Sequence, residues 1–276
     1  MRSAWRGVGG FLVARPLVAI VIAVVVVGVS LLFFTRRQET PVTHRVQRVA
    51  LTDQQQMQLG SQQYAKTLKQ ERAQIVSSGT GYDQVQRVAK RIEAVARRDK
   101  PGFVWKVTLI RKNEANAYCL PGGKIVVFTG ILPLTTTDAG LATVLGHEVA
   151  HATAEHVAER LEREHLTKVA VAIIAGGIAV SPASYAHVVA LLGIGGQAAE
   201  LPFSRKQESE ADHIGLIYMA RAGYDPHQAV AFWKRMLRAS KGKEPPEFAS
   251  DHPSTARRVK DVEGWLPEAE RARHGS

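Results

Sequence analysis

Residues 17–34, with the sequence LVAIVIAVVVVGVSLLFF, limit the fold more strongly than any other segment. These eighteen residues carry no charge, and Ser30 is their single polar side chain. An α-helix of this length spans roughly 27 Å, close to the ~30 Å thickness of a bilayer core. The segment lacks the small-residue cleavage site of a secretory signal, so we expect an uncleaved transmembrane anchor over residues 17–34.

The positive charge of the chain gathers around this segment. The formal net charge is +11, and no acidic residue precedes position 38. Five of the 36 basic residues flank the apolar run, namely Arg2, Arg6, Arg15, Arg36 and Arg37. The other 31 face 25 acidic residues without forming a basic stripe, so we expect no nucleic-acid partner. The excess of arginine before the run predicts a cytoplasmic N-terminus, with the bulk of the chain across the membrane.

The sequence predicts four segments. They are a basic flank (1–16), the anchor (17–34), a polar linker without apolar periodicity (35–50) and one folded domain (51–276). The single cysteine, Cys119, excludes a disulfide framework and a cysteine-cluster zinc site, and we expect it to be a small buried side chain.

The folded domain has the pattern of an α+β protein, mainly helical with one small sheet. Residues 52–98 read as helices interrupted by a turn at 77–81. Residues 104–110 and 124–128 are β-branched and aromatic runs, which predict strands. Helical periodicity returns after Asp138, which we expect to cap the next helix.

Residues 166–203 are apolar and almost uncharged. Glycine and proline divide them into runs that are short for a bilayer, which favours buried or lid-forming helices. A second membrane hairpin is the alternative.

The strongest chemical signal is the HExxH motif at residues 147–151. On a helix, residues i and i+4 lie on one face, so His147 and His151 can bind one metal ion. Glu148 lies beside them and is placed to take a proton from a water molecule. The alternative is a chance pattern on an amphipathic helix.

A catalytic metal site of this type needs a third protein ligand. His156 is out of register with the extended HExxHxxGxxH pattern, and we expect it to face solvent. Ser204 and Gln207 form a capping-box pattern, which predicts a helix that ends near Gly223.

Glu208 and Asp212 lie four residues apart on this helix. Glu208 is then the candidate third ligand, and Asp212 the candidate hydrogen-bond partner of a ligand histidine. The alternative is that Glu208, Glu210 and Asp212 form a solvated acidic first turn.

These motifs, in this order, resemble the membrane-associated zinc metallopeptidases of the HtpX, CAAX-protease, BepA and Oma type (metallopeptidase family 48). The resemblance covers about residues 50–265. Further matching pieces are Asn116-Ala117, Pro121-Gly122-Gly123, Thr129-Gly130, Pro202-Phe203, the E-x-x-A-D run at 208–212, Gly215, Ala222–Pro226, His252-Pro253 and Arg258.

The resemblance implies a zincin-like domain with one Zn²⁺ per chain. His147, His151 and Glu208 would be the zinc ligands, Glu148 the general base toward a zinc-activated water, and Asp212 the partner of a ligand histidine. The strand within residues 121–128 would line the cleft and pair with an extended substrate; the residues implied in substrate binding are Asn116, Pro121, Gly122, Gly123 and Ile125.

His252 has three readings. It could donate to the oxyanion of the tetrahedral intermediate, or it could be a fourth ligand that holds the enzyme latent. The third reading is a loop histidine before a helix.

By resemblance, we expect a single-pass membrane zinc endopeptidase that cleaves misfolded or unassembled proteins. The alternative is a zinc-bound but proteolytically silent chaperone or adaptor that holds extended chains. The short N-terminus favours the bacterial inner membrane, with the catalytic domain in the periplasm, over a mitochondrial location. The sequence leaves the substrate and the oligomeric state open.

Overall fold

The structure, a computed structural model, describes residues 36–49, 51–163, 203–240, 246–252 and 255–275. The predicted anchor and nearly all of the apolar stretch at 166–203 lie outside these residues. Within the described ranges, no helix is both long enough and apolar enough to cross a membrane.

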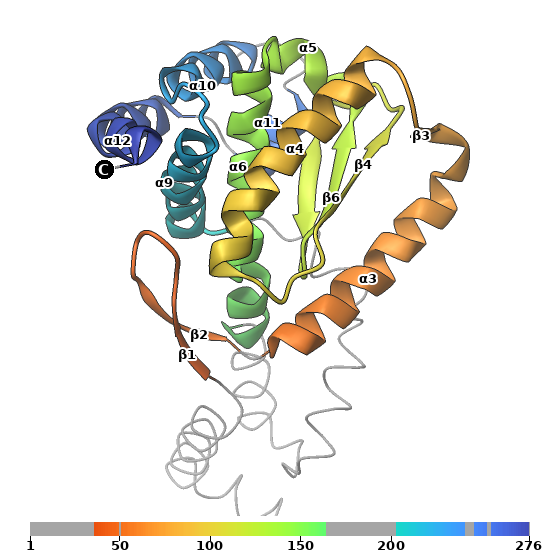
Figure 1. Ribbon diagram of the computed structural model, residues 1–276, viewed down its shortest axis with the longest axis horizontal. Coiled ribbons are helices and arrows are strands. Elements are labelled where there is room, and N and C mark those ends of the chain that lie inside the picture. The colour runs from red at the N-terminus through yellow and green to blue at the C-terminus, as the bar shows by residue number, and fades with distance from the viewer. Residues whose placement is uncertain (1–35, 50, 164–202, 241–245, 253–254, 276) are drawn as a thin grey trace, which may run out of the picture.

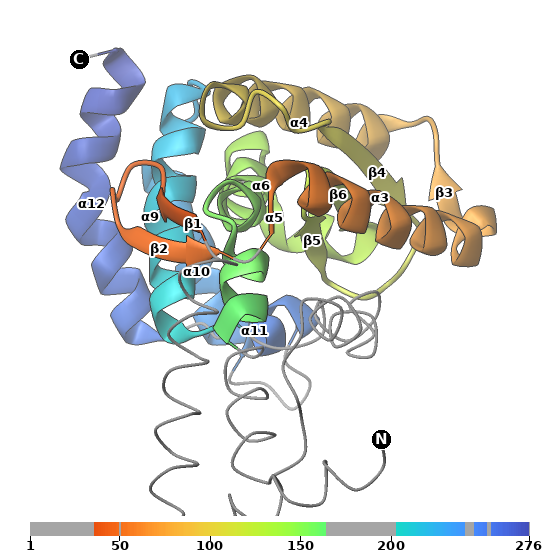
Figure 2. The ribbon, with the colours of Figure 1, turned by 90° about the horizontal axis from the view of Figure 1, so that it is seen from below.

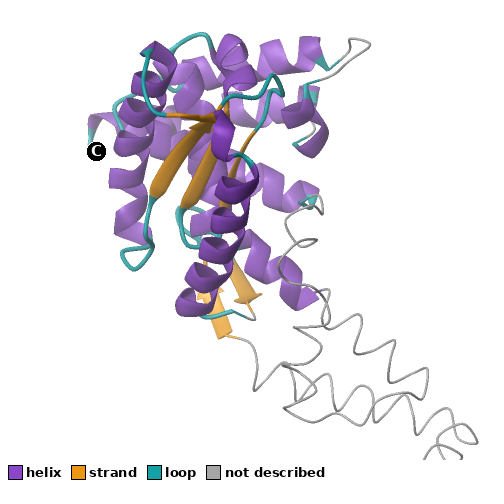
Figure 3. Cartoon of the chain, turned by 90° about the vertical axis from the view of Figure 1, so that its right-hand side faces the viewer, coloured by secondary structure: helices purple, strands orange, loops and turns teal. Residues whose placement is uncertain are grey.

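Helices predominate over strands, which confirms the predicted α+β class (Figure 3). The described helices are α3 (Asp53–Gln70), α4 (Thr80–Asp99), α5 (Leu132–Thr135), α6 (Asp138–Thr153), α9 (Arg205–Arg221), α10 (His227–Ala239), α11 (Glu247–Asp251) and α12 (Ala256–His274), with 3-10 turns at Arg72–Gln74 and Thr129–Ile131. The described strands are β1 (Arg36–Glu39), β2 (Val46–Val49), β3 (Ile75–Val76), β4 (Lys106–Ile110), β5 (Ala117–Leu120) and β6 (Lys124–Phe128). The strands predicted at 104–110 and 124–128 are therefore present as β4 and β6.

The main sheet has the order β3-β4-β6-β5, with β4 and β6 parallel and the other pairs antiparallel. Pro121 and two glycines of positive φ, Gly122 and Gly123, turn the chain between β5 and β6. This turn folds residues 117–120 back alongside β6. The prediction that the strand within 121–128 pairs with an extended substrate is therefore wrong, because β6 is paired on both sides and the edge strands of the described sheet are β3 and β5.

Residues 35–50, predicted to be a linker, contain an antiparallel hairpin of β1 and β2. The hairpin was missed because β1 is the polar run Arg-Arg-Gln-Glu, which has no apolar alternation. Ion pairs hold it instead, since Arg36 lies 2.7 Å from Asp53 of α3 and 2.8 Å from Glu155. In Figure 2 the hairpin crosses the end of α9.

Helix α6 is the centre of the fold. Every residue from Gly140 to Thr153 is buried, and α4, α9, α10 and β5 pack around it (Figure 1). The helix is capped by Thr137 rather than by Asp138, because the Thr137 hydroxyl accepts the Gly140 N–H at 3.0 Å. Asp138 pairs with Arg87 at 2.8 Å.

Helix α6 stops at Ala154, and residues 156–163 are helical again. Glu155 separates the two helices with a φ of 55°, a value that is uncommon for a residue with a side chain. Its buried carboxylate pairs with Arg36 and Lys100. The side chain of Gln47, from β2, donates to the Ala154 carbonyl at 2.5 Å. Contacts from the hairpin and from Lys100 therefore hold this break in place.

Helices α6 and α9 meet through two glycines. A Cβ added to Gly146 would lie 2.7 Å from the carbonyl oxygen of Gly215, and one added to Gly215 would lie 2.7 Å from the backbone nitrogen of His147. Both values are below normal contact distances and involve backbone atoms. The close approach of the two helices therefore requires glycine at both positions.

We predict that Gly215→Ala lowers the free energy of unfolding by about 1–3 kcal/mol, because the extra methyl group forces α6 and α9 apart. The matched control is Gly264→Ala on α12, where an added Cβ meets nothing within 4 Å. That change should raise stability by up to about 1 kcal/mol, since alanine favours helix. Urea denaturation of both variants checks this, and equal stability of the two would contradict it.

Candidate metal centre

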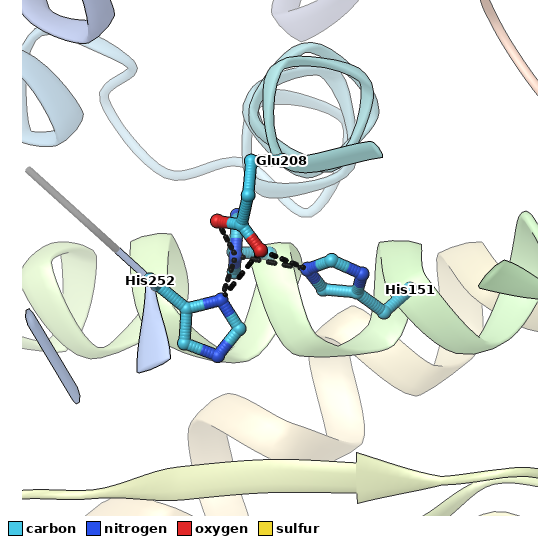
Figure 4. A group of neighbouring side chains, drawn as sticks. His151, Glu208 and His252 are labelled. Carbon is cyan, nitrogen blue, oxygen red and sulfur yellow. Dashed lines mark hydrogen bonds and ion pairs between the residues drawn. The ribbon is translucent and has the colours of Figure 1, made fainter. Parts of the chain in front are cut away.

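Four buried side chains converge beside the middle of α6. They are His147 and His151 of α6, Glu208 of the first turn of α9, and His252, which follows α11; one ligand atom of each lies within 4.8 Å of those of the other three. Figure 4 shows Glu208 reaching down from α9 between His151 and His252. The structure thus brings the three predicted zinc ligands together with His252.

The distances between the donor atoms match a metal site. His147 Nε2 lies 3.1 Å from His151 Nε2 and 3.5 Å from Glu208 Oε2. His151 Nε2 lies 3.4 Å from Glu208 Oε1. A tetrahedral ion with bonds of about 2.0–2.1 Å has ligand atoms about 3.3–3.4 Å apart. The three side chains are therefore spaced to share one small cation.

A buried carboxylate oxygen supports the same conclusion. Among the described residues, Glu148 Oε1 has no hydrogen-bond donor, whereas Glu208 Oε2, which also accepts no hydrogen bond, lies 3.3 Å from Arg258 Nη1. A buried carboxylate oxygen without a donor is unfavourable unless a cation is nearby. The donor set of two imidazoles and one carboxylate suits a divalent metal, and zinc above all.

The electrostatics of the group also favour a bound positive charge. Burial opposes ionisation of Glu208, but His147, His151 and His252 hold the pKa of that carboxyl well below its usual range. Burial and Arg258 act to lower the pKa of His147, yet Asp212 and Glu208 raise it to about 9. A metal ion at this site would supply the positive charge in place of that proton.

Glu148 lies on the side of the site that faces β5. Its Oε1 is 3.4 Å from His252 Nε2, and its carboxylate accepts a hydrogen bond from the backbone N–H of Cys119. Burial raises the pKa of the Glu148 carboxyl. The thiol of Cys119 is buried, as predicted.

Asp212 fixes the other nitrogen of His147. Its Oδ1 lies 3.0 Å from His147 Nδ1, and both side chains are buried. Arg258 of α12 contacts Asp212 at 2.6 Å and stacks on the ring of Trp233 at 3.5 Å. The predicted hydrogen bond between Asp212 and a ligand histidine is therefore present. Arg258 holds the Asp212 carboxylate in place by an ion pair. No role had been predicted for Arg258 itself.

The alternative of a solvated acidic turn is wrong, because Glu208, Glu210 and Asp212 are all buried. The prediction for His156 is also wrong. Its ring is buried, and its Nδ1 lies 2.9 Å from His151 Nδ1. One continuous helix would direct His156 outward, whereas the break at Glu155 turns it inward.

Sequence reasoning assigned no role to Phe203. Its ring stacks on His151 with centroids 3.9 Å apart and also contacts His252. Phe203 directly precedes the Ser204 cap of α9, and the predicted capping box is present. The position of this apolar residue directly before the helix cap was the only sequence signal that could have placed its ring over the site.

His252 is not a plain loop histidine. Its backbone N–H donates to the carbonyl oxygen of Phe248 at 2.9 Å, at the end of α11. Its buried imidazole contacts Glu208 at 2.9 Å. His252 does lie between α11 and α12, as the third interpretation expected, but its imidazole belongs to the buried ligand group, so the oxyanion and fourth-ligand interpretations stay open.

The residues predicted for substrate pairing are not part of the ligand group. Asn116 contacts Asp251 at 3.0 Å beside α11, and Ile125 is in the core. Pro121 and Gly122 pack against α3, at Gly60 and Met57.

Comparison with known proteins decides the family. A family model described as "Peptidase family M48" matches residues 82–266, about two thirds of the chain. The chain belongs to peptidase family M48. The resemblance drawn from its motifs is confirmed.

Curated relatives agree with this family. The mitochondrial metalloendopeptidase OMA1 of Schizosaccharomyces pombe is 41% identical over 194 residues, which cover 70% of this chain and 55% of the relative. Human OMA1 is 31% identical over 251 residues, covering 86% and 47%. The beta-barrel assembly-enhancing protease of Escherichia coli is 31% identical over 159 residues, covering 56% and 33%. The chain thus spans about half the length of these two OMA1 proteins.

We predict that Arg258→Met lowers the free energy of unfolding by about 3–5 kcal/mol, because Asp212 would lose its buried counter-charge. The matched control is Arg257→Met, the neighbouring residue of α12, which is exposed and pairs with Asp261 at 3.7 Å. That control should change stability by less than about 0.5 kcal/mol. Urea denaturation checks the pair. If Arg258→Met is no less stable than Arg257→Met, the ion pair of Arg258 with Asp212 does not stabilise the fold.

Proposed function

We propose that this protein is a membrane-anchored, zinc-dependent endopeptidase. The observation that carries the proposal is the buried group of His147, His151 and Glu208, spaced for one ion, with Glu148, whose buried Oε1 accepts no hydrogen bond, next to it. Membership of a peptidase family and the names of the relatives support the same activity.

When bound, zinc supplies a Lewis acid that polarises the scissile carbonyl and acidifies a water molecule. Glu148 accepts the proton of the attacking water, because its carboxylate oxygen lacks a donor and its pKa is raised by burial. The same carboxyl then delivers that proton to the leaving amine.

The open edge of β5 is the surface we propose for the substrate. The backbone N–H of Cys119 in β5 reaches Glu148, so this edge borders the metal group. An extended peptide that adds to the edge as a further strand would place a carbonyl beside Glu148. Backbone pairing of this kind binds unfolded chain with little sequence preference, which suits cleavage of misfolded or unassembled proteins.

Residues 17–34 support a membrane location, because their length and composition suit a bilayer-spanning helix. A bacterial inner membrane with a periplasmic catalytic domain stays our proposal. The arginine distribution around this segment supports the side of the membrane on which the catalytic domain would lie.

We predict that Glu148→Gln lowers the rate of casein cleavage by at least about 10³-fold, since the amide cannot accept the proton. The variant should retain one zinc per chain. The matched control is Glu93→Gln on α4, a carboxyl whose pKa is also raised by burial but which lies outside the metal group. It should cleave at the wild-type rate. Metal analysis and casein hydrolysis are measured on the full chain in detergent.

Other outcomes separate the alternatives. Zinc in both proteins with no cleavage by wild type would favour the silent chaperone or adaptor. Absence of zinc from the wild type would contradict the site itself.

We predict that His252→Ala retains zinc and lowers kcat by about 10²–10³-fold, as loss of an oxyanion donor does. His252 Nε2 lies 3.4 Å from Glu148 Oε1, on the side of the group where the reaction would occur. Steady-state cleavage of a quenched peptide measures the effect. Faster cleavage by the variant would instead identify His252 as a fourth ligand that blocks the open position.

A further inference from the structure

The imidazole of His151 has a second contact that the proposed mechanism does not use. Its Nε2 faces Glu208 at 3.4 Å, while its Nδ1 lies 2.9 Å from His156 Nδ1. His156 Nε2 in turn lies 3.1 Å from Glu210 Oε2. All four side chains are buried, so water does not replace these contacts. His151, His156 and Glu210 therefore form a chain of hydrogen bonds.

The carboxylate at the end of the chain sets its direction. An ionised carboxylate only accepts hydrogen bonds, so His156 must donate its Nε2–H to Glu210. The Nδ1 of a neutral His156 is then an acceptor, and His151 must donate its own Nδ1–H to it. The lone pair of His151 is left on Nε2, the atom that faces Glu208.

The N-terminal hairpin keeps Glu210 in place as an acceptor. Arg45 Nε donates to Glu210 Oε2 at 2.7 Å, and Thr40 donates to Oε1 at 2.7 Å, with Thr43 also in contact. Arg45 is fixed on its other side by Glu159, at 2.7 and 3.0 Å. The three donors that the hairpin supplies to Glu210 lie in the segment from Thr40 to Arg45, which joins β1 to β2.

We propose that His156 is a positioning residue for the metal ligand His151, and that the β1–β2 hairpin, through Arg45 and Glu210, is part of the support of the metal centre. This rests on the proposed function, in which His151 binds the metal. The two ligand histidines are then oriented by separate devices: Asp212 and Arg258 for His147, and the hairpin chain for His151. The hairpin follows directly after the predicted anchor, so the chain that leaves the membrane also orients a metal ligand.

Two substitutions of His156 test the direction of the chain. In His156→Asn the amide oxygen takes the place of Nδ1 and still accepts from His151, whereas in His156→Gln the longer amide reaches toward Glu210 instead. Both variants bury one amide, so they are matched in polarity. We expect zinc affinity within about threefold of wild type for Asn and weaker by about 10–100-fold for Gln.

A second pair tests the hairpin. Arg45→Met removes the arginine that holds Glu210, and we expect zinc affinity to fall by about 3–10-fold. The matched control is Arg37→Met, the neighbouring arginine of β1, whose side chain is exposed. It should leave zinc affinity unchanged.

The measurements are zinc affinity by competition with a chromophoric chelator and the visible absorption spectrum of the Co²⁺ form, on the full chain in detergent. A changed cobalt spectrum for His156→Gln and Arg45→Met, but not for Arg37→Met, supports the inference. Wild-type affinity and spectrum in both His156 variants would overturn it, whatever their melting temperatures.

Metal binding and cleavage by the wild-type chain distinguish failure of the proposed function from failure of this inference. A wild-type chain that binds no zinc overturns the metal site and this inference with it. A chain that binds zinc but cleaves nothing fails the proposed activity alone, because the contrast between the Asn and Gln variants is measured by binding.

Discussion

The close contact of Gly146 with Gly215 is the constraint on which the rest of the site depends. It lets α9 lie against α6 with backbone touching backbone, at a separation that any side chain would prevent. At that separation Glu208 reaches both histidines of α6, and Asp212 reaches the far nitrogen of His147. A wider spacing would leave a buried carboxylate and buried imidazoles without partners, which is costly in an apolar interior.

The charges around the centre are arranged in two rings. The inner ring holds imidazoles and carboxylates that together favour one cation. Farther from the centre, two arginines pair with acidic residues of α9 that support the ligand histidines, Arg258 with Asp212 and Arg45 with Glu210. Because these outer contacts come from α12 and from the hairpin, the two ends of the described chain both orient the residues of α6 and α9.

Local signals predicted the helices and the chemistry well. The HExxH spacing placed two imidazoles on one face, and the capping box of Ser204 and Gln207 placed the start of α9 and hence Glu208. These features depend on residues within one or two turns. The hairpin at 36–49 was missed, since its strands are held by ion pairs to distant residues and lack an apolar alternation that could be read locally.

The sequence by itself determined the metal-binding chemistry, because ligand type and helical spacing are local properties. Tertiary structure decided which strand lies at the edge of the sheet, since the residues of β6 alone do not predict its pairing with both β4 and β5. It also decided that His156 faces inward. Ion pairs of Glu155 with Arg36 and Lys100, residues from other parts of the chain, hold the break that reorients it. Contacts between residues distant in sequence have no local signature, so only the folded chain reveals them.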